Sequence, residues 1–146
     1  ELALDGIEVH GIDVHPIPLQ LAALISAGTT ATFEYLPATK LGFTHPHEFE
    51  AAILFDVLEH VFDPARVLTS VERALKAPGW IFINLPYFET EHQGQVEETH
   101  SDHVKEHLNS FSELELKGLF KDKKNLEMNL VTNEGEKKNW WIKYQV

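Results

Sequence analysis

The sequence contains no cysteine among its 146 residues. This absence excludes a disulfide framework, a thiolate nucleophile and a zinc site built on cysteine. It also fits a reducing compartment, because disulfides persist mainly in oxidising ones. We therefore expect the protein to be cytoplasmic.

Long hydrophobic runs are missing as well. No stretch approaches the roughly 18 consecutive apolar residues that indicate a membrane-spanning helix. Residues 1–13 contain acidic residues, no Lys or Arg and no apolar core segment, so we expect no signal peptide. Hydrophobic residues still make up 43% of the chain, which is enough for one core, and we assign residues 1–146 to a single domain.

Positive charge is scarce. Only 12 Lys and Arg residues oppose 23 Asp and Glu residues, which gives a formal net charge of -11. A field of this sign repels phosphate backbones, so we expect no nucleic-acid partner. We interpret the basic cluster at residues 117–124, with Lys137 and Lys138, as solvated surface.

The hydrophobic pattern predicts strands that alternate with helices. Strands are expected at residues 7–12, 30–36, 51–55 and 80–85, and helices at residues 19–27, between Asp63 and Pro78, and from Ser112 to about Lys121. Such alternation predicts an α/β fold with a mostly parallel sheet. Residues 126–132 and 139–146 predict a C-terminal antiparallel hairpin at one edge.

Two of the predicted helices have clear start signals. Asp63 is a suitable N-cap and Pro64 suits the first turn. Ser112 and Glu115 have the spacing of a capping box. Between these helices, residues 87–105 are polar, rich in His and without periodicity, which predicts a long loop of the kind that often forms a functional lid.

Several motifs resemble class I S-adenosylmethionine-dependent methyltransferases. Residues 56–64 read DVLEHVFDP, residues 72–80 read ERALKAPGW, and the strand that follows ends at Pro86. Residues 9–13 (VHGID) are similar to the second strand of that family, and residues 107–112 (HLNSFS) to a segment further along. The resemblance spans nearly the whole chain and implies a Rossmann-like methyltransferase fold.

The beginning of the chain departs from this family. Members open with a strand that leads into a Gly-x-Gly loop, but none of the eight glycines here form such a pair. The resemblance therefore implies that the first strand and the glycine loop are missing, which would leave the strands around Val9 and Ile53 each without a neighbour. We expect a fragment of a longer product, a homo-oligomer that covers the exposed sheet edge, or a rearranged segment that fills the gap.

The resemblance also implies a cofactor, S-adenosylmethionine. It assigns Asp13 to the ribose hydroxyls and places Val14, Leu36, Phe55 and Asp56 in the same pocket. Many members have an acidic residue after the third strand that meets the adenine amine, whereas residues 36–38 contain none. The implied activity is methyl transfer to a hydroxyl, amine or carbon of a small molecule. The alternative is a truncated or non-catalytic domain that does not bind cofactor on its own.

A carboxylate and histidine motif adds a metal hypothesis. Asp56, Glu59 and His60 have i, i+3, i+4 spacing, so a helical turn would bring them to one face. With His103 or His107 they would form a divalent metal site, as some ubiquinone-pathway and small-RNA O-methyltransferases resembling this pattern do. In most similar sequences the Glu and His instead line the mouth of the active site or support the loop. A metal-dependent hydrolase built on the same three residues is a further alternative.

Without a metal, an imidazole is the natural general base for a hydroxyl or amine, and His60 and His107 are the candidates. Tyr87 and Phe88 follow the strand that ends at Pro86 and are candidates for walls of the substrate pocket. The remaining histidines, His10, His15, His45, His47 and His92, are interpreted as surface or loop residues.

Overall fold

The computed structural model describes residues 2–87, 108–133 and 137–146. In chain order the elements are β1 (His10–Asp13), α1 (Pro16–Ile25), β2 (Thr32–Tyr35), the 3-10 turn η1 (Ala38–Lys40), α2 (Leu41–Thr44), β3 (Phe49–Phe55), the 3-10 turn η2 (Leu58–His60), α3 (Pro64–Ala74), β4 (Leu75–Pro86), α4 (Glu113–Phe120), β5 (Lys124–Thr132) and β6 (Lys138–Gln145). The alternation of strands and helices confirms the α/β class.

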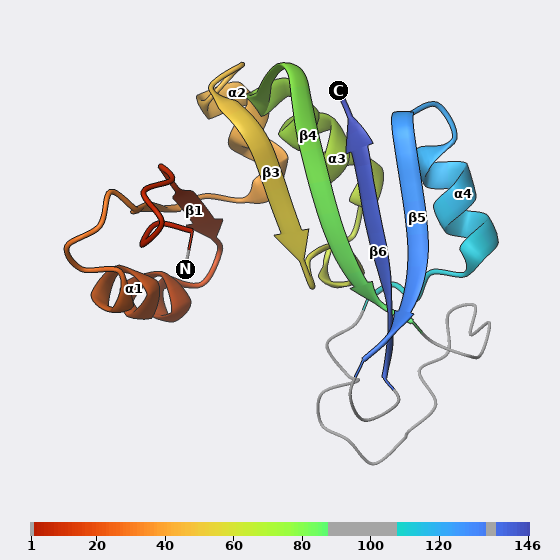
Figure 1. Ribbon diagram of the computed structural model, residues 1–146, viewed down its shortest axis with the longest axis horizontal. Helices are drawn as coiled ribbons and strands as arrows, with labels where there is room; N and C mark the ends of the chain where they lie inside the picture. The colour runs from red at the N-terminus through yellow and green to blue at the C-terminus, as the bar shows by residue number, and fades with distance from the viewer. Residues whose placement is uncertain (1, 88–107, 134–136) are drawn as a thin grey trace.

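The strands form two sheets, not the single, mostly parallel sheet that the sequence predicts. β1 and β2 pair in parallel as a separate two-stranded sheet, and the larger sheet has the order β3-β4-β6-β5. Only the β3–β4 pair of the larger sheet is parallel, because β6 runs antiparallel to both β4 and β5. The larger sheet is therefore mixed, and the predicted antiparallel hairpin is its β5–β6 edge (Figure 1).

Both predicted helix caps are present. The Asp63 side chain accepts a hydrogen bond of 3.0 Å from the backbone N–H of Arg66 at the start of α3. At α4, Ser112 and Glu115 form a reciprocal capping box. Each cap satisfies backbone donors that the first turn leaves without an intrahelical partner.

The core lies between one face of the larger sheet and the helices α3 and α4. Alternate residues of β4 and β6 face these helices and are buried; they are Ile81, Ile83, Leu85, Trp140, Ile142 and Tyr144. From the helices, Val67, Val71, Leu116 and Phe120 are between 0% and 3% exposed. Figure 1 shows α3 and α4 on the same side of this sheet. The alternate apolar residues of the strands thus pack against the apolar faces of the two helices.

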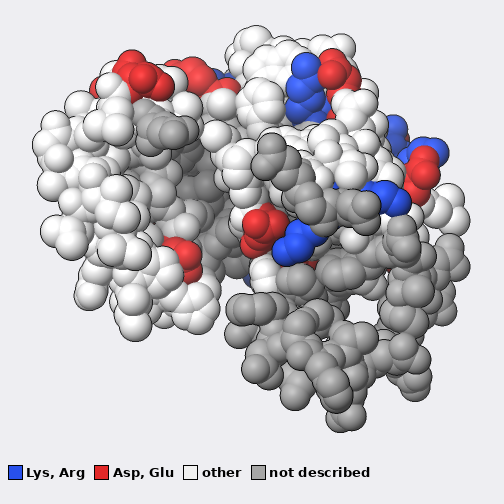
Figure 2. Space-filling view, turned by 60° about the horizontal axis from the view of Figure 1, so that its bottom comes forward, with Lys and Arg blue, Asp and Glu red and all other residues white. Residues whose placement is uncertain are grey.

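Charged side chains are paired across the surface. Lys117 lies 2.5 Å from Glu113, Lys123 lies 2.6 Å from Glu72, and Lys76 contacts Glu50. On the face shown in Figure 2, the Lys and Arg side chains of the described residues are scattered beside acidic ones and do not gather into a patch. This arrangement favours the interpretation of the lysines as solvated surface. In the described part of the chain, the helices are too short or too polar to cross a bilayer.

Candidate functional site

The carboxyl ends of the parallel strands lie on one side of the molecule. Figure 1 shows the arrowheads of β1, β3 and β4 pointing toward the same lower edge. Asp13 is the last residue of β1, and Asp56 directly follows β3. Open α/β folds bind ligands at this end of their strands, which makes it the candidate site.

Asp13 is held by a tight turn at the end of β1. Its Oδ1 atom accepts a hydrogen bond of 2.8 Å from the backbone N–H of His15, and its carbonyl oxygen accepts one of 3.0 Å from Leu36. The neighbouring Val14 is 46% exposed, whereas Leu36 is 7% exposed and packs in the core. Asp13 and Val14 are therefore accessible to a ligand, while Leu36 offers mainly its backbone.

Asp56 bends the chain sharply after β3. Its φ is 52°, in the left-handed region that costs non-glycine residues energy and that recurs at functional sites. Its backbone N–H donates a hydrogen bond of 3.2 Å to the carbonyl of Asn84 in β4. Because Asp56 does not have helical backbone angles, it is not part of the 3-10 turn η2. The expected helical turn through residues 56–60 is therefore not formed.

The side chains of the predicted metal motif consequently do not converge. Glu59 is 1% exposed, whereas Asp56 and His60 are exposed. In the described ranges, three potential ligand atoms lie within 4.8 Å of one another at a different place in the fold, which includes none of the three motif residues. His103, the predicted fourth ligand, lies outside the described residues, as do His107 and Phe88. The geometry does not support a metal site at this motif.

Glu59 is a buried carboxyl group. Neither of its carboxyl oxygens has a hydrogen-bond partner among the residues that the structure describes. Burial raises its pKa above the ordinary value of 4.5, and the nearby Asp56 carboxyl raises it further, while the backbone and His60 oppose the shift. Burial thus makes the ionised form of Glu59 less favourable than that of an exposed carboxyl group.

The backbone around η2 is hydrogen-bonded to Leu108 and Asn109. The carbonyl oxygen of Glu59 accepts hydrogen bonds of 2.7 Å from the N–H of Leu108 and 3.0 Å from that of Asn109. The Asn109 side-chain amide donates to the carbonyls of Leu58, at 3.1 Å, and Val61, at 2.6 Å. Sequence analysis did not single out Asn109, although it lies in the segment 107–112 that carried part of the resemblance.

Aromatic side chains surround the ends of β3, β4 and β6. Phe55 is 48% exposed and meets the edge of Trp141 with ring centroids 5.4 Å apart. Tyr87, just beyond β4, is half-buried and lies 6.2 Å from the ring of Trp140. Asn84 is buried beside Phe55, and among the described residues its Nδ2 atom has no hydrogen-bond partner. Phe55 and Trp141 lie on the open face of the larger sheet, whereas Tyr87 and Trp140 lie on the face that packs against the helices.

The sequence matches a methyltransferase family and curated methyltransferases. Residues 2–129 match the family described as a methyltransferase domain. The ubiquinone biosynthesis O-methyltransferase of Thiobacillus denitrificans is 35% identical over 81 residues, which are 54% of this chain and 35% of that protein. Its counterpart from Paraburkholderia phymatum is 33% identical over 57% of this chain and 37% of that protein. The match thus spans about a third of the length of these curated relatives.

Solved structures share the fold at lower identity. A SAM-dependent methyltransferase from Methanosarcina mazei superposes with a TM-score of 0.73 at 23% identity, covering 99% of this chain and 84% of that one. The 1,6-didemethyltoxoflavin-N1-methyltransferase of Burkholderia thailandensis gives 0.70 at 18% identity, covering 96% and 61%. Since the family match covers most of the sequence, the chain belongs to the methyltransferase domain family of class I S-adenosylmethionine-dependent methyltransferases.

Proposed function

We propose that this domain binds S-adenosylmethionine at the carboxyl ends of β1 and β3 and transfers its methyl group to a small molecule. The observation that carries the proposal is the common direction of β1 and β3, which belong to different sheets but end toward the same side of the molecule (Figure 1). Asp13 ends β1, and Asp56 directly follows β3. Family membership supplies the chemistry. The described residues supply the geometry for the ribose end of the cofactor.

Asp13 fits a ribose diol. Its Oδ1 atom already accepts the N–H of His15, which fixes the carboxylate and leaves Oδ2 for a hydroxyl donor. The exposed Val14 and Phe55 offer apolar contacts for the adenine. We assign no acidic partner to the adenine amine, because residues 36–38 contain none.

The bound cofactor supplies an already activated methyl group, so the protein needs only to orient the acceptor and remove its proton. His60, exposed just after the bend at Asp56, is our candidate for the residue that takes this proton, and His107 is the second. Tyr87 and Phe88 are proposed as walls that orient the acceptor. Among hydroxyl, amine and carbon acceptors we favour a hydroxyl, since the curated relatives are O-methyltransferases.

A second candidate function is a domain that does not bind cofactor on its own. The observation that favours it is the lack of any Gly-x-Gly pair in the sequence. Calorimetry separates the two candidates: the purified chain is titrated with the demethylated product S-adenosylhomocysteine. Binding supports the methyltransferase, and no binding at millimolar ligand supports the non-binding domain.

The variant Asp13→Asn tests the role of the carboxylate. Asn keeps a side-chain oxygen for the N–H of His15 but removes the charge that strengthens hydrogen bonds from the ribose hydroxyls. Two such bonds, at about 1.5–3 kcal/mol each, predict an affinity at least about tenfold lower. The matched control is Asp5→Asn, which changes an exposed acid before β1 and should bind like the unmodified chain. Equal affinity of all three proteins would show that Asp13 does not hold the ribose.

A further inference from the structure

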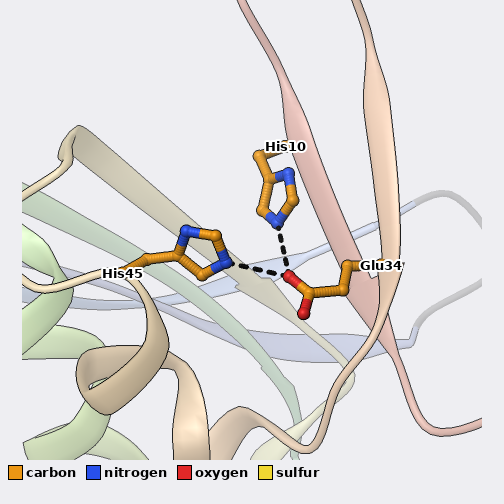
Figure 3. Close-up of side chains that lie close together, drawn as sticks. All are labelled: His10, Glu34 and His45. Atoms are coloured by element: carbon orange, nitrogen blue, oxygen red, sulfur yellow. Dashed lines mark hydrogen bonds and ion pairs between the residues drawn. The ribbon is translucent and has the colours of Figure 1, made fainter.

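Three side chains that are distant in the sequence meet beside β1. His10 is the first residue of β1, Glu34 belongs to β2, and His45 follows α2. Figure 3 shows both imidazole rings directed at the same carboxylate. The Nε2 atoms of His10 and His45 lie 3.3 Å and 2.8 Å from Oε2 of Glu34, and all three potential ligand atoms lie within 4.8 Å of one another.

We propose that His10, Glu34 and His45 form a binding site for a divalent transition-metal ion such as Zn²⁺. Two imidazoles and one carboxylate are a ligand set that zinc accepts, with an open position left over. Ligand atoms about 2.0–2.2 Å from a tetrahedral ion are about 3.3 Å from each other. The distances to Glu34 are close to this value, so an ion requires only small movements of the rings.

The second nitrogen of each ring is already hydrogen-bonded. Nδ1 of His45 lies 2.8 Å from Oε2 of Glu48, and Nδ1 of His10 lies 2.9 Å from Oγ1 of Thr32. Metal-binding histidines almost always have such an outer partner, because it fixes the ring orientation and the tautomer that presents Nε2 to the ion. This outer shell is an observation separate from the convergence of the three ligands.

An apolar ring holds the two imidazoles in place. The ring centroid of Phe49 lies 5.6 Å from that of His10 and 5.8 Å from that of His45. The side chains of His10 and His45 nevertheless remain 18% and 21% exposed, and that of Glu34 39% exposed. An ion can therefore enter from solvent into a site whose ligands are already oriented.

In the absence of metal, the same contacts require a proton on each nitrogen of His45. Glu34 and Glu48 are both acceptors when ionised, so each must receive an N–H from the ring between them. In agreement, the hydrogen bonds that the ring donates to Glu34 and Glu48 raise the pKa of His45. A metal ion on Nε2 takes the place of the proton there.

The site lies away from the proposed cofactor end and has a structural role. Phe49, which packs against it, is the first residue of β3, whereas Asp56 follows the last. The three ligands join β1 and β2 to the segment between α2 and β3, and no strand pairing links these two parts of the described chain. A bound ion therefore fastens the smaller sheet to the larger one.

The test is titration of chelator-treated protein with ZnCl₂, followed by calorimetry and thermal melting. We expect one ion per chain at this site and a higher melting temperature with zinc, since only an ion held by the native state stabilises it. His45→Ala and Glu34→Gln should each weaken binding at least tenfold and abolish the shift in melting temperature. Glu48→Gln removes only an outer partner and should weaken binding about 10–100-fold.

The matched control is His15→Ala, which removes an exposed histidine that caps α1 without a side-chain hydrogen bond. It should bind zinc as the unmodified protein does. Should His45→Ala fail to fold, Glu48→Gln still tests the proposal, because it leaves all three ligands in place. Unchanged affinity in Glu48→Gln and Glu34→Gln, or zinc that leaves the melting temperature of the unmodified protein unaltered, would overturn the site.

Discussion

At the scale of single residues, Glu59 differs from an ordinary surface acid. Burial raises its pKa, and in the described part of the chain neither carboxyl oxygen has a hydrogen-bond partner. A carboxyl group with a raised pKa holds its proton more tightly in the folded state than in the unfolded one. The free energy of unfolding must therefore fall as pH rises through the ordinary value of 4.5 toward the raised pKa.

The variant Glu59→Gln should lose this pH dependence, because an amide does not ionise. Urea unfolding between pH 4 and pH 8 measures it: the variant should gain stability relative to the unmodified protein as pH rises. Any constant cost of the amide cancels in this comparison. Glu8→Gln, at an exposed position, should show no such trend. Parallel pH curves for Glu59→Gln and the unmodified protein would mean that Glu59 is ionised in the fold.

Sequence analysis could propose residues at strand ends, but it could not propose residues that meet only through the fold. Asp13 and Asp56 were proposed for the cofactor site because each lies at the end of a predicted strand, which the local pattern shows. The meeting of His10, Glu34 and His45 depends on the register of β1 and β2, which places His10 opposite Thr32 and two residues from the partner of Glu34. His10 and His45 lie 24 and 11 residues from Glu34 in the sequence, and such separations match no helix or strand period that could indicate a contact.

At the scale of elements, the sequence predicted the strands and the capped helices but missed the short helical segments η1 and α2. α3 and α4 have the predicted caps, and the strand predicted at residues 51–55 is β3 with two more residues at its start. β4 begins at Leu75, five residues earlier than predicted, since its first residue already pairs with Phe49. η1 and α2 were not predicted, because α2 has only four residues and no period can be read from them.

The position of α2 depends on a close approach to α3 that only glycine permits. The N–H of Gly42 donates a hydrogen bond of 3.0 Å to Oγ of Ser70, and a Cβ atom at this position would overlap the Ser70 carbonyl and lie 2.6 Å from Cβ of Arg73. Gly42→Ala should therefore lower the free energy of unfolding by about 1–3 kcal/mol, the usual cost of overpacking. Chemical denaturation measures the change.

Gly118 provides the opposite case within the same protein. It lies inside α4, and a Cβ atom there meets nothing within 4 Å. Gly118→Ala should raise the free energy of unfolding by about 0.5–1 kcal/mol, because alanine favours the helix. If Gly42→Ala raised the free energy of unfolding, as Gly118→Ala is expected to, the close packing of α2 on α3 would be contradicted.

At the scale of the whole molecule, one face of the larger sheet is covered by helices, and no described helix covers the other. Ile53, Phe82 and Lys143 are neighbours across β3, β4 and β6 on this second face. The apolar side chains of this face are between 37% and 50% exposed. A contiguous apolar surface of this kind usually marks an interface in a stable protein.

We expect a second copy of the chain to cover this face, in line with the homo-oligomer predicted from the exposed sheet edge. Light scattering should then give a mass above the 16.6 kDa of one chain. Phe82→Glu places a charge in the centre of the face, where its desolvation opposes association, and should restore the monomer mass. Phe43→Glu changes a residue on α2 that is 83% exposed and should leave the assembly intact. A monomer mass for the unmodified chain at every concentration would contradict the expectation, because the apolar face would then remain in contact with water.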